Sequence, residues 1–228
     1  MLYFVGVGPG DPELITMKAV RILQEADAIA IPDSGKDSVV WKIAGKWMEG
    51  KPICRLSMPM KGKKEEWEEA HRKAAETLLE WLKEYKTIAY LVLGDPGIYA
   101  SSSYLMKRIA PHHLCKVIPG VPAMCAVAAE LGIPLCEQGE DLYITDSYQK
   151  HSKLLHRNTI VMKVGKQLES LKELATEYSI YAAKNIGMAD SWMGEIDEFP
   201  GETASYFMTA IIKTQSEFER CVRNPAGK

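Results

Sequence analysis

The chain has 228 residues, of which 46% are hydrophobic and 25% are charged. This length allows a sizeable core and leaves room for two small domains. The net charge of −2 and an isoelectric point near 6.2 provide no overall attraction to nucleic acid, and no apolar run reaches the length of a membrane-spanning helix. The short apolar start has no basic region ahead of it and is expected to be a strand rather than a signal peptide. We therefore expect a cytoplasmic protein whose partner is a small molecule.

The first predicted element is the strand MLYFV, which runs directly into the loop GVGPGDPELIT. Glycines at positions 6, 8 and 10 allow the backbone to turn sharply and to approach a ligand closely. Asp11 stands where a dinucleotide-binding GxGxxG loop has its third glycine, and a carboxylate there would repel a pyrophosphate. The loop therefore predicts a different small-molecule ligand, with a plain turn into a helix starting near Pro12 as the alternative.

Strands and helices then alternate through the first half, which predicts a parallel sheet. The expected elements are a strand at 28–31, a helix at 37–48, a strand at 52–56 and a long charged helix at 63–84. Two further strands, at 87–93 and 116–118, end in the glycine-rich turns GDPGIY and PGVPA. Because ligands bind beyond the carboxyl ends of parallel strands, we expect the three glycine-rich loops to converge on one molecule.

The second half contains more strand than helix, which predicts a mixed sheet. We expect helices at 125–131 and 168–177, and strands at 141–145, 159–164, 180–184, 194–199 and 205–213. The segment 109–116 contains Pro111 and two histidines and lacks periodic apolar residues. It is therefore the predicted linker between an N-terminal domain at 1–112 and a C-terminal domain at 113–228.

The five cysteines form no CxxC pair and are expected to be reduced, mostly buried thiols. The five histidines show no spacing typical of a metal site; His71, for example, lies in a charged helical stretch. We expect no protein-bound metal.

Three motifs, GVGPGDPELIT, GDPGIY and IPGVPA, resemble the signature loops of the S-adenosylmethionine-dependent tetrapyrrole methylases, and the resemblance covers residues 1–215. The segments SMPM, YASSSYL, IGM and ASYF are similar to those of the C20-methyltransferases of cobalamin biosynthesis, which act on precorrin-2 or cobalt-factor II. The resemblance implies two α/β domains with the active site in the cleft between them. It also implies S-adenosylmethionine as methyl donor, a tetrapyrrole substrate and a homodimer.

The resemblance also assigns cofactor-binding positions. They are Pro9, Leu93, Gly94, Asp95, Ile98, Pro122, Ala123, Val164, Gly187 and Phe207. Asp95 is suited to pair with the ammonium group of the cofactor, although an Asx turn before Pro96 would also explain it. The chain departs from relatives at Pro122, where a hydroxyl residue is common, and at Lys184-Asn185, where C20 enzymes often have Arg-Cys.

The acetate and propionate groups of a tetrapyrrole require basic partners. The expected substrate-binding residues are Gly10, Arg55, Lys61, Lys163 and Lys184. Asp11 is the candidate catalytic residue, which would orient the macrocycle or accept its proton. A helix cap is the alternative role for this aspartate.

Several other functions remain open from the sequence. A precorrin-4 C11 or uroporphyrinogen-III methylase would keep the same glycine-rich loops. Diphthine synthase and ribosomal RNA methylases share the implied fold, but an acidic chain without a basic stripe argues against RNA. A non-catalytic S-adenosylmethionine-binding module is the alternative from another class. No residue decides whether the substrate contains cobalt, and we favour the cobalt form.

Overall fold

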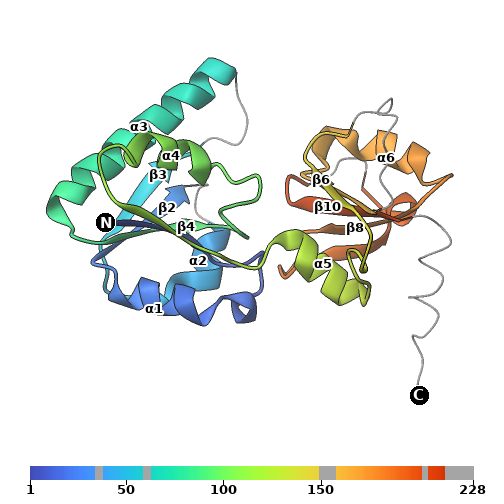
Figure 1. The fold of residues 1–228 in the computed structure, drawn as a ribbon, viewed down its shortest axis with the longest axis horizontal. Helices are drawn as coiled ribbons and strands as arrows, with labels where there is room; N and C mark the ends of the chain where they lie inside the picture. Colours follow the sequence, from blue (N-terminus) through green and yellow to red (C-terminus); the bar gives the residue numbers. More distant parts are fainter. Residues whose placement is uncertain (34–37, 59–62, 149–157, 202–204, 214–228) are drawn as a thin grey trace. The chain divides into compact units, whose positions relative to one another are not determined.

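The computed structural model describes residues 1–33, 38–58, 63–148, 158–201 and 205–213. The chain divides into two compact units, 1–122 and 123–228 (Figure 1). The division lies ten residues after the expected boundary at 112/113. The reason is that Cys115–Ile118 forms a strand of the first sheet, so the segment 109–116 belongs to the first unit and is not the linker.

The first unit contains a five-stranded sheet in which every pairing is parallel. Its strands are β1 (Leu2–Gly6), β2 (Ala28–Asp33), β3 (Ile53–Ser57), β4 (Ile88–Val92) and β5 (Cys115–Ile118), in the order β3-β2-β4-β1-β5. The predicted parallel sheet is thus confirmed. The order places β1 between β4 and β5, so the three strands that end in glycine-rich turns are neighbours.

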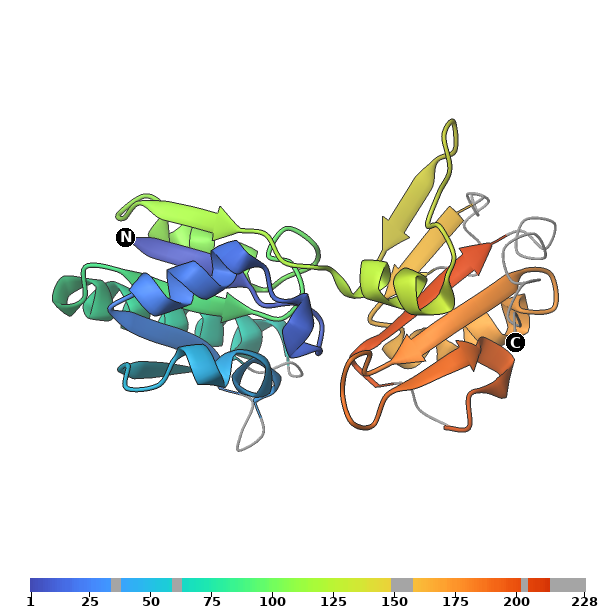
Figure 2. The ribbon, with the colours of Figure 1, turned by 90° about the horizontal axis from the view of Figure 1, so that it is seen from below.

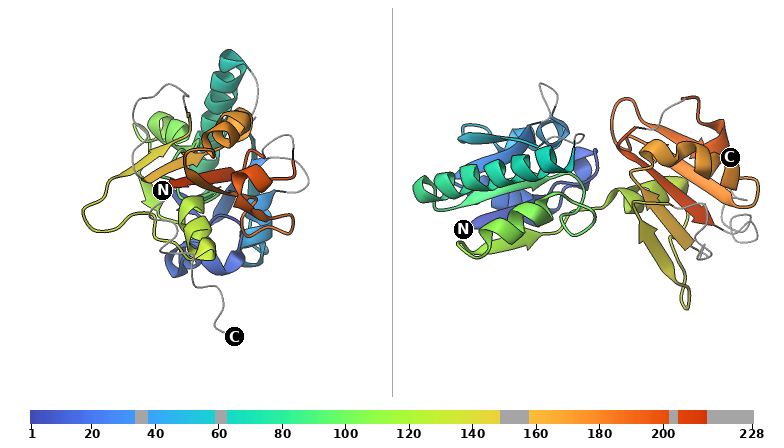
Figure 3. Two further views of the ribbon diagram at one scale, coloured as in Figure 1. Left: turned by 90° about the vertical axis from the view of Figure 1, so that its right-hand side faces the viewer. Right: turned by 90° about the horizontal axis from the view of Figure 1, so that it is seen from above.

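Helices cover both faces of this sheet (Figures 1 and 3). Helices α3 (Lys64–Glu84) and α4 (Ser102–Ile109) pack on one face, against the side chains of Phe4 and Tyr90. Helices α1 (Met17–Glu25) and α2 (Val39–Ala44) pack on the other, against Val5 and Leu91. Successive residues of a strand point to opposite faces, so each central strand contributes to both cores.

Helix α1 begins later than expected. The chain first forms a short 3-10 turn, Pro12–Leu14, and α1 then starts at Met17, where the Thr16 side chain accepts a hydrogen bond from the backbone N–H of Ala19 at 3.1 Å. Helix α2 is also shorter than predicted, because the 3-10 turn Gly45–Trp47 follows it. The hydroxyl cap of Thr16 is the signal that marks the true start of α1.

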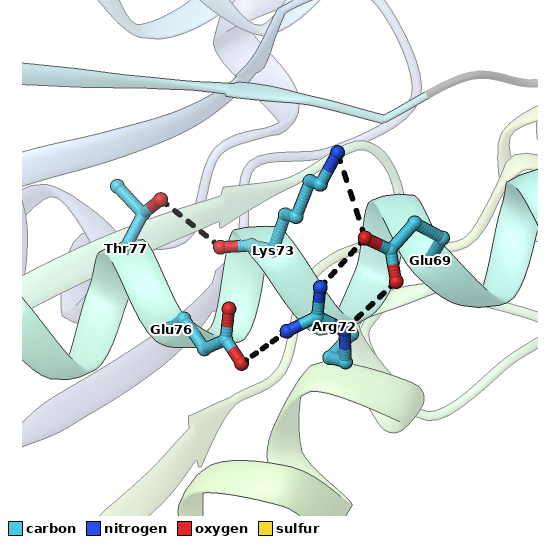
Figure 4. A network of polar contacts seen from close by, with 5 residues as sticks. All are labelled: Glu69, Arg72, Lys73, Glu76 and Thr77. Atoms are coloured by element: carbon cyan, nitrogen blue, oxygen red, sulfur yellow. Dashed lines mark hydrogen bonds and ion pairs between the residues drawn. The ribbon is translucent and has the colours of Figure 1, made fainter.

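Helix α3 has a charged outer face and a buried inner face. Arg72 donates to Glu69 at 2.6 and 2.7 Å and to Glu76 at 2.5 Å, and Lys73 lies 3.5 Å from Glu69 (Figure 4). The hydrogen bond from Arg72 lowers the pKa of Glu69 to about 2. These side chains are exposed to water, so their ion pairs contribute little to the stability of the fold.

The inner face of α3 contains a histidine that lies among charged residues in the sequence. His71 is only 1% exposed, and its ring lies 3.8 Å from that of Trp67, measured between centroids. Its Nδ1 is 2.8 Å from the carbonyl oxygen of Trp67. Burial is the main cause that lowers the pKa of His71, so the neutral imidazole is favoured.

The second unit contains a mixed sheet, as predicted (Figure 2). Its elements are α5 (Ala123–Leu131), β6 (Leu142–Thr145), β7 (Asn158–Met162), α6 (Leu168–Leu174), β8 (Ser179–Lys184), β9 (Trp192–Glu195) and β10 (Met208–Lys213). The strand order is β6-β7-β10-β8-β9, and β10 runs antiparallel to both of its neighbours. The strand expected at 194–199 is shorter, because the 3-10 turn Ile196–Glu198 follows β9.

The expectation of mostly buried cysteines is wrong for the described part of the chain. Cys54 is buried, which raises the pKa of its thiol to about 11, whereas Cys115 is half-buried and Cys125 and Cys136 are exposed. Cys221 lies outside the described residues.

Among the residues that the structure describes, no helix is long and apolar enough to cross a membrane. In the same ranges, no group of three or more His, Cys, Asp or Glu side chains is placed to hold a metal ion.

Candidate functional site

Three glycines meet at the carboxyl ends of β1, β4 and β5. A Cβ atom on Gly6 would lie 2.6 Å from the nitrogen of Gly120 and 2.7 Å from the oxygen of Gly94. A Cβ on Gly120 would overlap the oxygen of Gly94 and lie 2.8 Å from the carbonyl carbon of Gly6. These obstacles are backbone atoms that cannot rotate away, so glycine is required for the loops to pack together. We call Gly6, Gly94 and Gly120 the glycine junction.

Backbone hydrogen bonds hold the first two loops side by side. Gly94 N donates to Gly8 O at 2.8 Å, and Gly8 N donates to Gly94 O at 3.4 Å. Both residues have positive φ, 86° at Gly8 and 72° at Gly94. A Cβ on Gly94 would have only the carbonyl oxygen of Val121 within reach, at 4.0 Å, so this side of the loop is open for the close approach of a ligand.

The carboxylate of Asp95 joins the second and third loops. Its Oδ1 accepts a hydrogen bond from Gly97 N at 2.7 Å, and its Oδ2 accepts one from Gly120 N at 2.9 Å. The Asx turn considered for this residue is therefore present. An ionised carboxylate has about four lone-pair positions, so Asp95 retains capacity for a cationic partner such as an ammonium group.

Asp11 caps the 3-10 turn that follows the first loop. Its Oδ1 accepts a hydrogen bond from Glu13 N at 2.8 Å, and its backbone carbonyl accepts one from Leu14 N at 3.1 Å. The side chain is half-buried. The capping role is thus confirmed, and one carboxylate oxygen has no hydrogen bond in the described structure.

The remaining predicted residues of the first unit are placed differently. Pro9 and Gly10 are buried in the first loop, while Leu93, Ile98 and Pro122 are half-buried beside the second and third loops. Arg55 is not brought to the junction by the sheet, because β3 is an edge strand that β2 separates from β4. Its guanidinium lies 5.6 Å from the centroid of the exposed Trp41 ring. Lys61 lies outside the described residues.

In the second unit, three segments meet at one end of the sheet. β7 and β8 end there and β10 begins there, because β10 lies antiparallel between them. Val164 N donates to Met208 O, and Asn185 N donates to Phe207 O, both at 3.0 Å. This end brings the predicted residues Gly187 and Phe207 to adjoining segments. Val164 is 0% exposed and supports the turn that follows β7. Ala123 is half-buried at the start of α5.

The two predicted lysines of this unit lie at the same end of the sheet. Lys163 follows β7 with φ of 56°, and its Nζ is 5.4 Å from the centroid of the Tyr206 ring. Lys184 is the last residue of β8, and its Nζ is 3.6 Å from Asp190 Oδ2. The ammonium group of Lys184 is thus already beside a carboxylate.

In the sequence, Asn185 stands out only as a departure from relatives, and no role is assigned to it or to Ser205, whose side chains connect these segments. The available signal was the pattern Asn185-Ile186-Gly187 after a strand, since asparagine and glycine both favour turns that need positive φ.

Comparison with known proteins identifies what this chain is similar to. A family model described as Tetrapyrrole (Corrin/Porphyrin) Methylases matches residues 1–198. A Methanocaldococcus jannaschii protein named "Probable cobalt-precorrin-2 C(20)-methyltransferase" is 32% identical over 222 residues, covering 93% of this chain and 95% of that protein. The cobalt-precorrin-2 C(20)-methyltransferase of Salmonella typhimurium is 26% identical and covers 95% of this chain and 98% of its own length. Among solved structures, a CobF protein of Corynebacterium diphtheriae, described as related to cobalamin synthesis, superposes with a TM-score of 0.75. It is 25% identical and covers 94% of this chain and 98% of its own.

Proposed function

Because the chain belongs to the tetrapyrrole methylases, a family of S-adenosylmethionine-dependent methyltransferases, we propose that it methylates C20 of cobalt-factor II or precorrin-2 in cobalamin biosynthesis. The structural observation that carries the methyltransferase reading is the glycine junction, with the Asp95 carboxylate beside it. The choice of C20 is supported by two relatives with this printed specificity, each of which aligns with the chain over nearly its full length.

We propose that Asp95 binds the ammonium group at the amino-acid end of the cofactor. Its carboxylate is held by two backbone N–H groups, so it needs little rearrangement when a ligand binds. The open side of Gly94 lets ligand atoms approach the backbone. The full set of proposed cofactor-binding residues is Pro9, Leu93, Gly94, Asp95, Ile98, Pro122, Ala123, Val164, Gly187 and Phe207.

The reaction asks mainly for positioning. When bound, S-adenosylmethionine supplies a methyl group on a sulfonium, which is a good leaving group. The protein's residues have to hold the nucleophilic carbon of the substrate in line with that methyl group and exclude water. This requirement explains why the strongest motifs are glycine-rich loops rather than a nucleophile paired with a base.

We propose that basic residues bind the carboxylates of the macrocycle. Lys163 and Lys184 lie at the same end of the second sheet, and Arg55, Lys61 and Gly10 complete the proposed set. Asp11 is the proposed residue that orients the macrocycle or accepts its proton, and its capping bond leaves one oxygen for this task.

We further propose a cytoplasmic homodimer. The four described cysteines are free, which is consistent with a reducing compartment.

The test of this proposal is methyl transfer to defined substrates. The purified protein is incubated with S-adenosylmethionine and, separately, with cobalt-factor II, precorrin-2, precorrin-4 and uroporphyrinogen III. We expect mass spectrometry to show the addition of one methyl group to cobalt-factor II or precorrin-2 and none to the other two. Transfer only to precorrin-4 or uroporphyrinogen III would overturn the C20 assignment. Cofactor binding without transfer to any of the four would indicate a non-catalytic module. Light scattering tests the dimer.

A further inference from the structure

Backbone strain in the described chain is concentrated in a few loops. Among the described residues, positive φ is found at three positions that are not glycine: Tyr99 at 46°, Lys163 at 56° and Asn185 at 52°. Such a conformation is uncommon outside glycine and persists where the surrounding structure enforces it. Of these three, Asn185 is held by hydrogen bonds from both its side chain and its backbone.

Asn185 is 8% exposed and has a hydrogen bond in each direction from its side chain. Its Nδ2 donates to Asp190 Oδ2 at 2.7 Å, and its Oδ1 accepts from Ser205 Oγ at 2.9 Å. Ser205 Oγ in turn accepts from Phe207 N at 3.2 Å. The backbone N–H of Asn185 donates to Phe207 O at 3.0 Å. One amide therefore ties the turn at 185–190 to the segment 205–207.

We propose that Asn185 is a positioning residue for cofactor binding, which fixes the turn that contains Gly187 against the segment that contains Phe207. The proposal rests on the proposed function, in which both residues contact the cofactor. Asn185 itself touches neither cofactor nor substrate in this account. Its role is to set the distance between two backbone segments that the hydrogen bond from Asn185 N to Phe207 O also joins, directly beyond the β8–β10 pairing.

The chemistry of the site requires an amide. A donor is needed toward the carboxylate of Asp190 and an acceptor is needed toward the hydroxyl of Ser205. Aspartate at 185 would keep the acceptor but would lose the donor and place a second carboxylate against Asp190 Oδ2, which lies 3.6 Å from the Lys184 ammonium group. Glycine would adopt the positive φ easily but would lose both side-chain bonds.

The second sheet provides a matched control at its opposite end. Asn158 begins β7 and pairs with Lys213 at the end of β10. It is 0% exposed, its Nδ2 donates to Glu140 Oε2 at 2.9 Å, and its Oδ1 accepts from Lys213 Nζ at 2.7 Å. Asn158→Asp therefore makes the same substitution beside an acidic partner at the opposite end of the sheet, although there the new carboxylate also faces the ammonium group of Lys213.

The experiment measures S-adenosylhomocysteine affinity by calorimetry and the midpoint of thermal unfolding for both variants. Asn185→Asp is expected to weaken binding by about tenfold or more, the scale for buried polar groups left unpaired. The double variant Asn185→Asp/Asp190→Asn reverses donor and acceptor and is expected to restore most of the affinity. Asn158→Asp is expected to leave binding within about twofold of the wild type, whatever its effect on the unfolding midpoint, because it lies at the opposite end of the sheet. Asn185→Gly, which relieves the strained φ, is expected to fold and still to bind weakly.

Wild-type affinity in Asn185→Asp or Asn185→Gly would overturn the proposal, as would an equal loss in Asn158→Asp. Amide hydrogen exchange in the ligand-free protein gives a second readout, because Phe207 N–H should exchange faster in Asn185→Asp than in the wild type. If the wild type binds S-adenosylhomocysteine and the variants bind it equally well, only the role of Asn185 is refuted. If the wild type does not bind this ligand, the proposed function itself is refuted.

Discussion

The two units join strand ends in opposite ways. In the first unit the ends of β1, β4 and β5 meet through glycine backbones, with one carboxylate, Asp95, across them. In the second unit the ends of β7 and β8 meet the start of β10 through side chains, chiefly Asn185 and Ser205. The first arrangement has no room for a Cβ atom at Gly6 or Gly120, whereas the second depends on the pattern of donors and acceptors.

The largest effect is expected where an atom is added to the glycine junction. Gly120→Ala places a Cβ against Gly94 O and Gly6 C, so we expect it to destabilise the protein by about 1–3 kcal/mol, the cost of overpacking, and to weaken cofactor binding. Urea unfolding and calorimetry measure both. Gly50→Asn is the control, since Gly50 has open space around it and asparagine tolerates its positive φ. A stable Gly120→Ala protein with normal binding would show that the junction is not tightly packed.

Asp11→Asn separates capping from catalysis. Asparagine caps as well as aspartate, so stability and S-adenosylhomocysteine affinity should remain near those of the wild type. Turnover should fall by about 10²-fold or more if the second oxygen orients the substrate or accepts its proton. Single-turnover rates provide the measurement. A wild-type rate would leave Asp11 as a cap alone.

Asp95→Asn tests whether the carboxylate beside the glycine junction also binds the ammonium group of the cofactor. The variant should lose about 1–3 kcal/mol of S-adenosylhomocysteine affinity, the range for a charged hydrogen bond. Some stability should be lost as well, because the new amide cannot accept from both Gly97 N and Gly120 N. The control ligand is 5′-methylthioadenosine, which lacks the amino-acid end and should bind the variant and the wild type alike. An equal loss for both ligands would assign Asp95 to loop structure alone.

His71 predicts a pH effect confined to the first unit. Burial lowers its pKa below 6.5, so the unfolded chain binds a proton at a higher pH than the folded one does. The free energy of unfolding should therefore decrease as the pH falls through 6.5, and it should be insensitive to this residue above that pH. Urea unfolding at several pH values, compared with His71→Phe, measures the contribution. The same slope in both proteins would exclude His71 as its source.

The smallest effect is expected on the outer face of α3. Arg72→Ala removes the exposed pairs with Glu69 and Glu76, which water largely replaces. Any stabilisation would be present above the ordinary pKa of 4.5 for Glu69 and would disappear as the pH falls toward 2. Thermal unfolding at pH 7 should be unchanged within error, and so should cofactor binding. A clear loss of thermal stability or of cofactor binding in Arg72→Ala would show that these exposed ion pairs contribute to the fold or to the site.

The contrast between the glycine junction and the side-chain network of Asn185 and Ser205 explains what could be predicted from sequence. Glycine-rich turns after apolar strands are visible in the chain, so the convergence of the loops around Gly6, Gly94 and Gly120 was predictable. The network of Asn185 was not, because it depends on residues 20 positions apart that only the sheet brings together. The expected boundary at 112/113 differs from the division at 122/123 because β5 has only four residues, and so short a pattern cannot be distinguished from a linker. The burial of His71 was not predictable, because the residues around it in the sequence of α3 are charged.

The central claim is methyl transfer to C20, and the position of the new methyl group tests it most directly. S-adenosylmethionine labelled with ¹³C in its methyl group is incubated with the protein and cobalt-factor II or precorrin-2, and the product is analysed by NMR. We predict a single labelled methyl group attached to C20. A labelled methyl group on any other ring carbon, or an unlabelled product, would contradict the account.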